Sequence, residues 1–173
     1  MAINPQELLD LAKRLVGPTP GALESDLRRG ISTAYYAVFH MLINEIMTNF
    51  VTLPSFRPKV ARALQHGTMK AVCIKYNPVK PNKASNQYET PETDEFPSQV
   101  LTSELRQVAS AFVQLHAARE EADYDGGSTI QHTAAATAIQ LAEGAFQAWL
   151  TAQNDPCGSI FLQEMFFKSI VKR

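Results

Sequence analysis

Apolar residues recur every three or four positions along most of this chain, and that spacing is the feature that most limits how it can fold. At about 100° per residue, such positions fall on one face of an α-helix. One stripe of this kind comprises Leu101, Leu105, Val108, Phe112 and Leu115, and an earlier one Leu27, Ile31, Ala34, Val38 and Leu42. No segment reads convincingly as a strand. We therefore predict an all-α fold, an up-and-down helical bundle of five to six helices.

The same periodicity, read together with prolines, glycines and capping residues, predicts six helical segments. They cover about Pro5 to Val16, Thr19-Pro20 to Asn49, Pro58 to Tyr76, a segment ending at Gly126-Gly127, Thr129 to Gln153, and residues 159–172. In the third segment we expect the inward positions to be Val60, Ala63, Leu64, Gly67, Ala71 and Ile74.

The length of the chain suits a single domain. With 173 residues and 45% hydrophobic content, it can bury one core over residues 1–173. A Pro-rich loop at 78–98 is too long to be a plain connector. The helix at 159–172, capped by Ser159, is apolar on all sides, which predicts that the body or a second subunit covers it, and hence a homodimer. Its apolar residues are Ile160, Phe161, Leu162, Met165, Phe166, Phe167, Ile170 and Val171.

Composition removes several classes of function. Two cysteines, Cys73 and Cys157, are too few for a disulfide framework, and a reduced, cytoplasmic setting is expected. The longest uncharged runs contain His, Asn, Gln and Thr, so we expect no membrane partner. The net charge of −1 does not suit a general polyanion binder. Glycine-rich phosphate loops, CxxC and HExxH motifs are absent from the sequence, and we predict no metal and no cofactor.

The apolar stripe from Leu101 to Leu115 is continued by charged residues. Arg119 falls at nearly the angle of Leu101, in the middle of the apolar face, and Asp123 follows one turn later. One interpretation is an i, i+4 ion pair that completes the fold at a helix end. Because burying such a pair adds little net stability, the other interpretation is a site for recognition or chemistry. The candidate residues are Arg119, His116, Asp123 and Tyr124.

The longest predicted helix carries a polar face that contains no Lys or Glu. It consists of Arg29, Thr33, Tyr36, His40 and Asn44. Exposed helix faces usually carry long charged side chains, so this face is expected to meet another part of the molecule. We predict a polar cleft with Arg119 on one wall and Arg29, Tyr36 and His40 on the other.

Charge is distributed unevenly along the chain. No acid occurs from Ile46 to Tyr88, whereas several cations do, and an acidic stretch follows at once. One interpretation is a solvated face with the acidic loop folded over it. The other is a nucleic-acid surface, for which the candidate residues are Arg57, Lys59, Arg62 and Lys70.

Two segments, DLRRGISTAYYAVFHMLINE and LHAAREEADYD, resemble the HEPN family of small bacterial α-helical proteins, in particular its stand-alone type with AYYAxFH and RxxADYD segments. The matched residues are Arg28, Arg29, Ala34, Tyr35, Tyr36, Ala37, Phe39 and His40, then Arg119, Ala122, Asp123, Tyr124 and Asp125. The resemblance covers about Leu8 to Trp149. It implies an up-and-down bundle that dimerises with its polar sites near the interface.

The resemblance also carries expectations about function. Active HEPN proteins are metal-independent ribonucleases, often toxins or antiviral effectors, that use an arginine followed after four to six residues by a histidine. Here the next histidine after Arg119 is His132, outside that spacing. We therefore expect a binding or regulatory module in a bacterial or phage defence or toxin–antitoxin setting.

For such a module, the resemblance implies one of three partners: RNA, a nucleotide or a minimal nucleotidyltransferase. One alternative is a metal-independent HEPN ribonuclease with a non-standard active site, in which Arg119 acts with His116 or His40. A second alternative is a purely structural scaffold.

Overall fold

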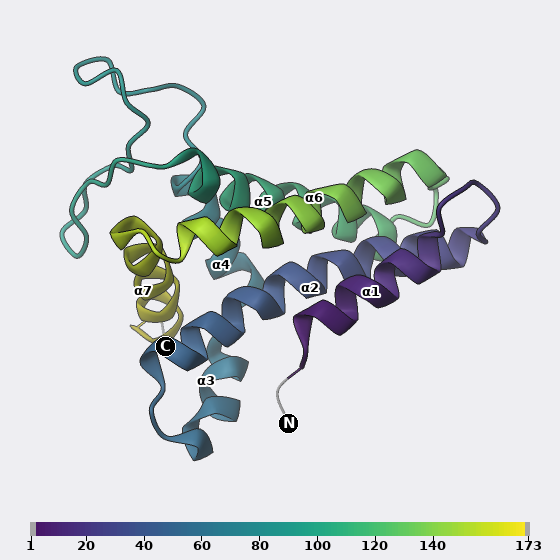
Figure 1. Ribbon diagram of the computed structural model, residues 1–173, viewed down its shortest axis with the longest axis horizontal. Helices are drawn as coiled ribbons and strands as arrows, with labels where there is room; N and C mark the ends of the chain where they lie inside the picture. The colour runs from purple at the N-terminus through teal and green to yellow at the C-terminus, as the bar shows by residue number, and fades with distance from the viewer. Residues whose placement is uncertain (1–2, 172–173) are drawn as a thin grey trace. The chain divides into compact units, whose positions relative to one another are not determined.

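The computed structural model describes residues 3–171, and the regular structure in that part of the chain is helical (Figure 1). The elements are α1 (Pro5–Val16), α2 (Glu24–Phe50), the 3-10 helix η1 (Pro54–Phe56), α3 (Arg57–Ala63), α4 (His66–Lys75), α5 (Ser103–Tyr124), α6 (His132–Ala152) and α7 (Pro156–Val171). Over residues 3–171 the only strand-like pairing is an isolated bridge between Glu89 and Val100. The prediction of an all-α helical bundle is confirmed.

Helix α1 has the predicted bounds because both of its ends carry local signals. Asn4 caps the first turn, its Oδ1 accepting from the Gln6 backbone N–H at 3.0 Å, and Pro5 takes the first helical position. Gly17 ends the helix with a φ of 70°, a conformation that favours glycine.

The predicted start of the next helix, at Thr19-Pro20, is wrong. Gly21 has a φ of 148°, outside the helical region, so the chain is not helical there. The first turn forms instead where the Leu23 carbonyl accepts from the N–H groups of Asp26 and Leu27, at 2.9 and 3.0 Å. The helix therefore begins at Glu24.

The third predicted segment is two helices, which brings their number in residues 3–171 to seven instead of five to six. Leu64 and Gln65 are extended, with ψ of 108° and 139°, so α4 starts in a new register after α3. The inward positions predicted beyond the break are consequently wrong, since Gly67, Ala71 and Ile74 are exposed. The residues buried on α4 are Met69, Val72 and Cys73.

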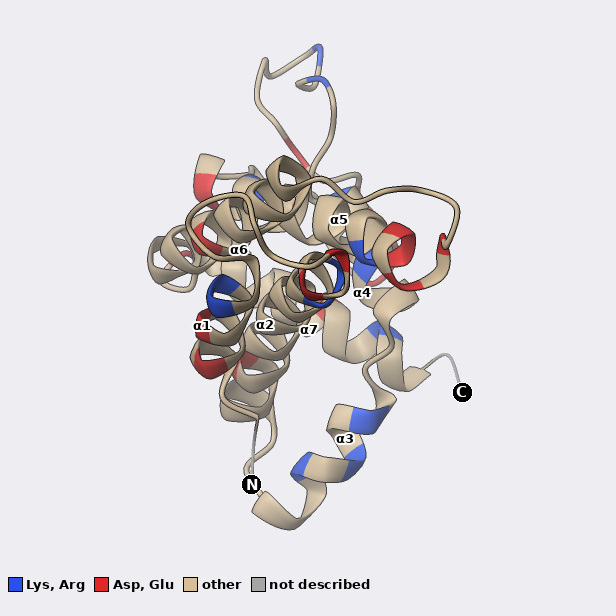
Figure 2. Cartoon of the chain, turned by 90° about the vertical axis from the view of Figure 1, so that its right-hand side faces the viewer, with Lys and Arg blue, Asp and Glu red and all other residues tan. Residues whose placement is uncertain are grey.

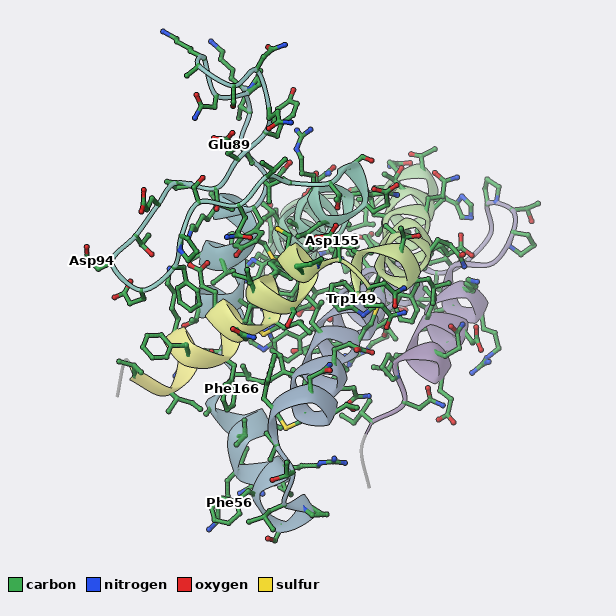
Figure 3. All side chains as sticks on the ribbon, turned by 60° about the vertical axis from the view of Figure 1, so that its left-hand side comes forward. Phe56, Glu89, Asp94, Trp149, Asp155 and Phe166 are labelled. Atoms are coloured by element: carbon green, nitrogen blue, oxygen red, sulfur yellow. The ribbon has the colours of Figure 1, made fainter. Side chains whose placement is uncertain are left out.

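Helix α7 begins three residues before the predicted Ser159. Asp155 provides the cap, since the Cys157 N–H donates to its Oδ1 at 2.7 Å, and Pro156 occupies the first position. Figure 3 labels Asp155 at this end of α7. The predicted end at residue 172 lies outside the described residues.

The chain divides into two compact units, which are described separately. The first comprises the chain up to Met41 together with Ala111–Phe146, and the second comprises Leu42–Ser110 together with the chain from Gln147 onward. That residues 1–173 form a single domain stays a prediction.

In the first unit, α1 lies along the N-terminal part of α2 (Figure 1). The two helices approach closely at Gly30, where a Cβ atom would lie 2.5 Å from Cγ2 of Val16. The predicted core stripe of α2 is buried here at Leu27, Ile31, Ala34 and Val38. On α5, Phe112 and Leu115 are fully buried as well.

In the second unit, α7 packs against α4. The Phe161 ring lies 4.9 Å from the Tyr76 ring and 6.4 Å from the Trp149 ring, centroid to centroid. Phe161, Leu162 and Met165 are buried, whereas Phe167, Ile170 and Val171 are 41%, 42% and 60% exposed. This unit therefore covers one side of α7 and leaves an apolar strip near its C-terminal end.

A fully buried carboxylate, Glu164, lies within this apolar helix. Its Oε2 is 3.0 Å from Lys75 Nζ, and its Oε1 is 2.6 Å from Lys168 Nζ. Burial and the neighbouring Glu164 raise the pKa of the Tyr76 hydroxyl well above its ordinary value. The two ammonium groups compensate a charge that would otherwise be costly to bury.

The loop at 78–98, which belongs to the second unit, contains no helix, and aromatic contacts hold it to the helices of that unit. The Arg106 guanidinium lies 3.3 Å from the centroid of the Tyr88 ring. Phe96 meets Phe167 edge to face, with 5.9 Å between the ring centroids. The acidic part of the loop is thus held beside α7.

Candidate functional site

The C-terminal end of α5 gathers four of the predicted site residues around the Arg119 guanidinium, in the first unit. Arg119 Nε lies 2.8 Å from Asp123 Oδ2, one turn along the same helix. Its Nη2 donates to the hydroxyl of Tyr124 at 3.2 Å and to that of Tyr36 on α2 at 3.4 Å. The Arg119 side chain is 13% exposed. We call Arg119, Asp123, Tyr36 and Tyr124 the arginine cluster.

The charge of Arg119 is stabilised by its surroundings. Burial disfavours the charged form, but the neighbouring Tyr36, Tyr124 and Asp123 outweigh it and raise the pKa of the guanidinium. The guanidinium carbon lies 5.2 Å from the centroid of the Tyr124 ring and 5.8 Å from that of Tyr36, within cation–π range. Nη1 makes no hydrogen bond to any described residue. One arm of the guanidinium fork thus remains available to an acceptor.

Ser32 contacts the arginine cluster, although it was not among the predicted site residues. Its hydroxyl donates to Asp123 Oδ2 at 3.2 Å, and the residue is buried. Ser32 lies one turn before Tyr36 on α2, so α2 contacts both Asp123 and Arg119. A spacing of four residues between Ser32 and Tyr36 was the available signal, but serine is too common on helices for that spacing to be specific.

Arg28 fixes the turn that follows α5. Its guanidinium is held by Glu24 Oε1 at 2.8 Å and donates to the carbonyls of Ala122 at 3.0 Å and Asp125 at 2.9 Å, and to that of Ser128. The hydrogen bond from Arg28 lowers the pKa of Glu24. The last carbonyls of a helix lack N–H partners within it, and Arg28 donates to one of them, that of Ala122, as well as to two carbonyls of the turn that follows. Arg28 thereby holds the segment that carries Tyr124.

His40 lies beside the arginine cluster through Tyr36. The two rings are stacked, with 6.3 Å between their centroids and 27° between their planes. Burial lowers the pKa of His40 from an ordinary value of 6.5, so the imidazole is neutral at pH 7. A neutral imidazole can accept a proton, which is the property required of a general base.

His116 has a different environment. It is 6% exposed, its Nδ1 lies 3.2 Å from Glu120 Oε2, and the Tyr35 ring meets it edge to face at 5.5 Å. It lies about one turn before Arg119 on α5. In the folded chain it is a buried residue packed against Tyr35.

Arg29 stands apart from the arginine cluster. It is exposed on α2, two turns before Tyr36, and shares no contact with Arg119. Apart from the backbone hydrogen bonds of α2, its carbonyl accepts from the Thr33 hydroxyl at 2.7 Å. Of the three residues predicted to face Arg119, the structure therefore brings Tyr36 into contact, places His40 beside Tyr36, and leaves Arg29 outside.

The electrostatic surroundings of the arginine cluster are acidic. Glu120, Glu121 and Asp125 lie within the same turn and a half of chain as Arg119 and Asp123. Glu120 and Glu121 are exposed. A polyanion lying along this end of α5 would meet these carboxylates, whereas one compact phosphate on Arg119 would meet fewer of them.

The predicted nucleic-acid patch is split in the second unit. Arg57, Lys59 and Arg62 are exposed on α3, whereas Lys70 lies on α4 and is half-buried. The break at Leu64 and Gln65 separates the two helices.

Over residues 3–171, no group of three or more His, Cys, Asp or Glu side chains is placed to hold a metal ion. Within the same range, no helix is long and apolar enough to cross a membrane. Compared with known proteins, the chain matches no family model, no curated protein and no solved structure.

Proposed function

We propose that this protein is an HEPN-like binding and regulatory module that holds the phosphate of a nucleotide on its arginine cluster. The observation that carries the proposal is the geometry of Arg119, whose Nη1 is available while Asp123, Tyr36 and Tyr124 fix the rest of the guanidinium. An arginine fork suits phosphate oxygens, and its order before binding reduces the entropy lost on binding. Tyr124 accepts from Arg119, so its own hydroxyl hydrogen can be donated to the ligand.

The acidic residues around the cluster favour a nucleotide or a terminal phosphate over a long RNA. Glu120, Glu121 and Asp125 would repel the successive phosphates of a strand lying across the end of α5. A mononucleotide places its phosphate on Arg119 and presents a base, which carries no charge, to the exposed Tyr124 ring. Tyr124 is 73% exposed, so its ring is accessible for stacking.

The resemblance of the AYYAVFH and REEADYD segments to HEPN proteins supplies the proposed setting. We place the chain in a bacterial or phage defence or toxin–antitoxin system, in the cytoplasm, as a homodimer with a minimal nucleotidyltransferase as its protein partner. In that setting the bound nucleotide is what the partner supplies or consumes.

Calorimetric titration of the intact protein with AMP tests the proposal. Arg119→Ala is expected to lower the affinity by about tenfold or more, because a charge-assisted hydrogen bond is lost. Arg119→Lys should recover only part of it, because lysine keeps the charge and loses the fork. Arg14→Ala is the matched control, since it removes an exposed arginine from α1 in the same unit. Equal affinity in Arg119→Ala and in the unaltered protein would overturn the proposal.

A metal-independent ribonuclease is the second candidate, and the position of His40 favours it. A neutral imidazole stacked on Tyr36, whose hydroxyl meets Arg119, would allow His40 to act as the base while Arg119 stabilises the phosphorane. Incubation with total RNA in EDTA separates the candidates. Cleavage that disappears in both Arg119→Ala and His40→Ala would identify a ribonuclease. A structural scaffold would be indicated if Arg119→Ala left every ligand and partner interaction unchanged.

A further inference from the structure

The element η1–α3, in the second unit, carries positive charge that no carboxylate compensates. Arg57, Lys59 and Arg62 are exposed, and none of them forms an ion pair with a described residue. Carboxylates lie beside five cations elsewhere in the described part of the chain, namely Lys13, Arg28, Lys75, Arg119 and Lys168. Lys80 and Lys83 are also exposed without an ion pair to a described residue, but they lie in the loop and not on a helix. Figure 2 shows the basic residues of α3 on a helix that carries no acid. The charge of α3 is therefore directed to an external partner or to solvent alone.

The acidic loop does not cover this surface. Figure 3 shows both Glu89 and Asp94 well away from Phe56, which lies at the bottom of the view. Asn82 donates to Glu89 at 2.8 Å, and the next part of the loop is held at Phe96, whose ring lies against Phe167. The acidic loop therefore lies away from the cations of α3, whereas its Phe96 ring lies 5.9 Å from the Lys75 ammonium on α4.

An aromatic ring lies among these cations. Phe56, the last residue of η1, is 50% exposed, and the Lys59 ammonium lies 5.4 Å from its ring centroid. Arg57 is anchored by its Nε, which donates to the Val51 carbonyl at 3.2 Å. Lys59 and Arg62 are three residues apart, so their Cα atoms lie about 4.5 Å apart along the helix axis and on neighbouring sides. The element thus presents an exposed ring and adjacent cations on one short segment.

We infer that η1–α3 is a binding surface for single-stranded nucleic acid, in which Lys59 and Arg62 contact the phosphates and Phe56 stacks on an unpaired base. Aromatic rings that receive bases beside cations that follow the backbone are the common means of binding single strands without sequence preference. A duplex would leave Phe56 unused, because its bases are already stacked. The surface lies outside the arginine cluster, so this inference does not depend on the proposed nucleotide site.

An anionic membrane is the competing partner for a basic segment with exposed apolar residues. Leu53 and Phe56 are 59% and 50% exposed, but Val60 is only partly exposed and Ala63 is buried. An interfacial helix needs a continuous apolar face to insert into the headgroup region. The apolar residues of α3 are buried or partly buried and its cations are exposed, so a nucleic acid is favoured over a membrane as the partner.

Fluorescence anisotropy with a labelled oligouridylate and a labelled oligothymidylate tests this surface in the intact protein. The double substitution Lys59→Gln/Arg62→Gln is expected to weaken binding of both strands about tenfold at low salt. It should also reduce the slope of log affinity against log salt by roughly 1.4, since two phosphate contacts are lost. The matched control is Lys80→Gln/Lys83→Gln, which removes two exposed cations from the loop and is expected to leave binding within about twofold.

Phe56→Leu isolates the stacking contribution, because leucine keeps the apolar bulk and removes the π-face. We expect about fivefold weaker binding or more, with the salt slope unchanged. Circular dichroism confirms that each variant retains its helices. The inference is overturned if both double substitutions weaken binding equally, which would show an effect of net charge alone, or if Phe56→Leu has no effect. It is also overturned if anionic phosphatidylglycerol vesicles bind through Lys59 and Arg62 while neither oligonucleotide binds.

Discussion

Glu164 and the two lysines that flank it form the most demanding electrostatic arrangement in the second unit. The carboxylate is fully buried, and Lys75, its partner on α4, has a side chain that is 10% exposed. We predict that Glu164→Gln lowers the free energy of unfolding by about 3 kcal/mol, because it leaves a nearly buried ammonium without its counter-charge. Equilibrium urea unfolding measures the change. Lys168→Gln is the control and should cost about 1 kcal/mol or less, because Lys168 is 30% exposed and Lys75 remains. Equal costs would contradict this account.

His40 gives stability a defined dependence on pH. Because its pKa in the folded chain is lowered from 6.5, the unfolded chain binds a proton that the folded chain does not, and stability is lost as the pH falls through 6.5 towards the lower folded pKa. The contribution is fully present above the unfolded pKa. We predict that the loss of stability between pH 7.5 and pH 5.5 is smaller in His40→Gln, which has no proton to take up. Urea unfolding at the two pH values measures it, and identical losses in the two proteins would show that His40 titrates normally.

Some residues of the site could be predicted from sequence and others could not. Arg119 could, because a charged residue within an apolar stripe is rare, and its i, i+4 relation to Asp123 follows from helix geometry alone. The contact with Tyr36 was expected from a polar face without lysine or glutamate. Ser32 and Arg28 act through partners about ninety residues away in sequence or further, and nothing local marks such pairings. Glu164 was not predicted either, because its partner Lys75 is also distant in sequence.

At the scale of elements, the predicted helix bounds agree with the structure where strong local signals mark the helix ends. Helix α1 was predicted with its bounds because Pro5 and Gly17 mark its two ends, and the structure adds Asn4 as the N-terminal cap. The break between α3 and α4 falls at Leu64 and Gln65, which are neither glycine nor proline and are ordinary helix formers. Burial of Met69 and Cys73 in place of Ala71 and Ile74 shows that tertiary packing selected the register there. No pattern within the segment contains that information.

Gly30 offers a test of how closely α1 and α2 pack. Helix propensity alone would make Gly30→Ala stabilising by about 1 kcal/mol. A Cβ at this position would lie 2.5 Å from Cγ2 of Val16, a stiff β-branched side chain, so we predict a net loss of about 1–3 kcal/mol instead. In a chain that already carries Val16→Ala, the overlap is gone and the same substitution should become neutral or stabilising. Thermal and urea unfolding of the four proteins measure the sign in each background. A loss that persists in the Val16→Ala background would place the cause elsewhere.

At the scale of the whole molecule, the strip at the end of α7 bears on assembly. Ile170 and Val171 are 42% and 60% exposed beside the exposed Phe167, and a second copy offering the same strip would cover them. We predict a homodimer at micromolar concentration in light scattering, and a folded monomer when Ile170→Ser and Val171→Ser are combined. Leu150→Ser is the control, because it removes another exposed apolar side chain, on α6. An unaltered protein that is already monomeric at micromolar concentration would exclude this dimer.

The fluorescence of Trp149 can report on unfolding of the second unit. Trp149 is the one tryptophan in the sequence, it is 3% exposed, and it lies beside Phe161 in the second unit. Its emission therefore follows the packing of α6 and α7 in that unit, whereas far-ultraviolet ellipticity follows the helices of both units. Helices α2, α5 and α6 each pass from one unit into the other without interruption. Superimposable denaturation curves from the two signals would mean that the units unfold as one cooperative body, and an earlier change in emission would mean that the second unit opens first.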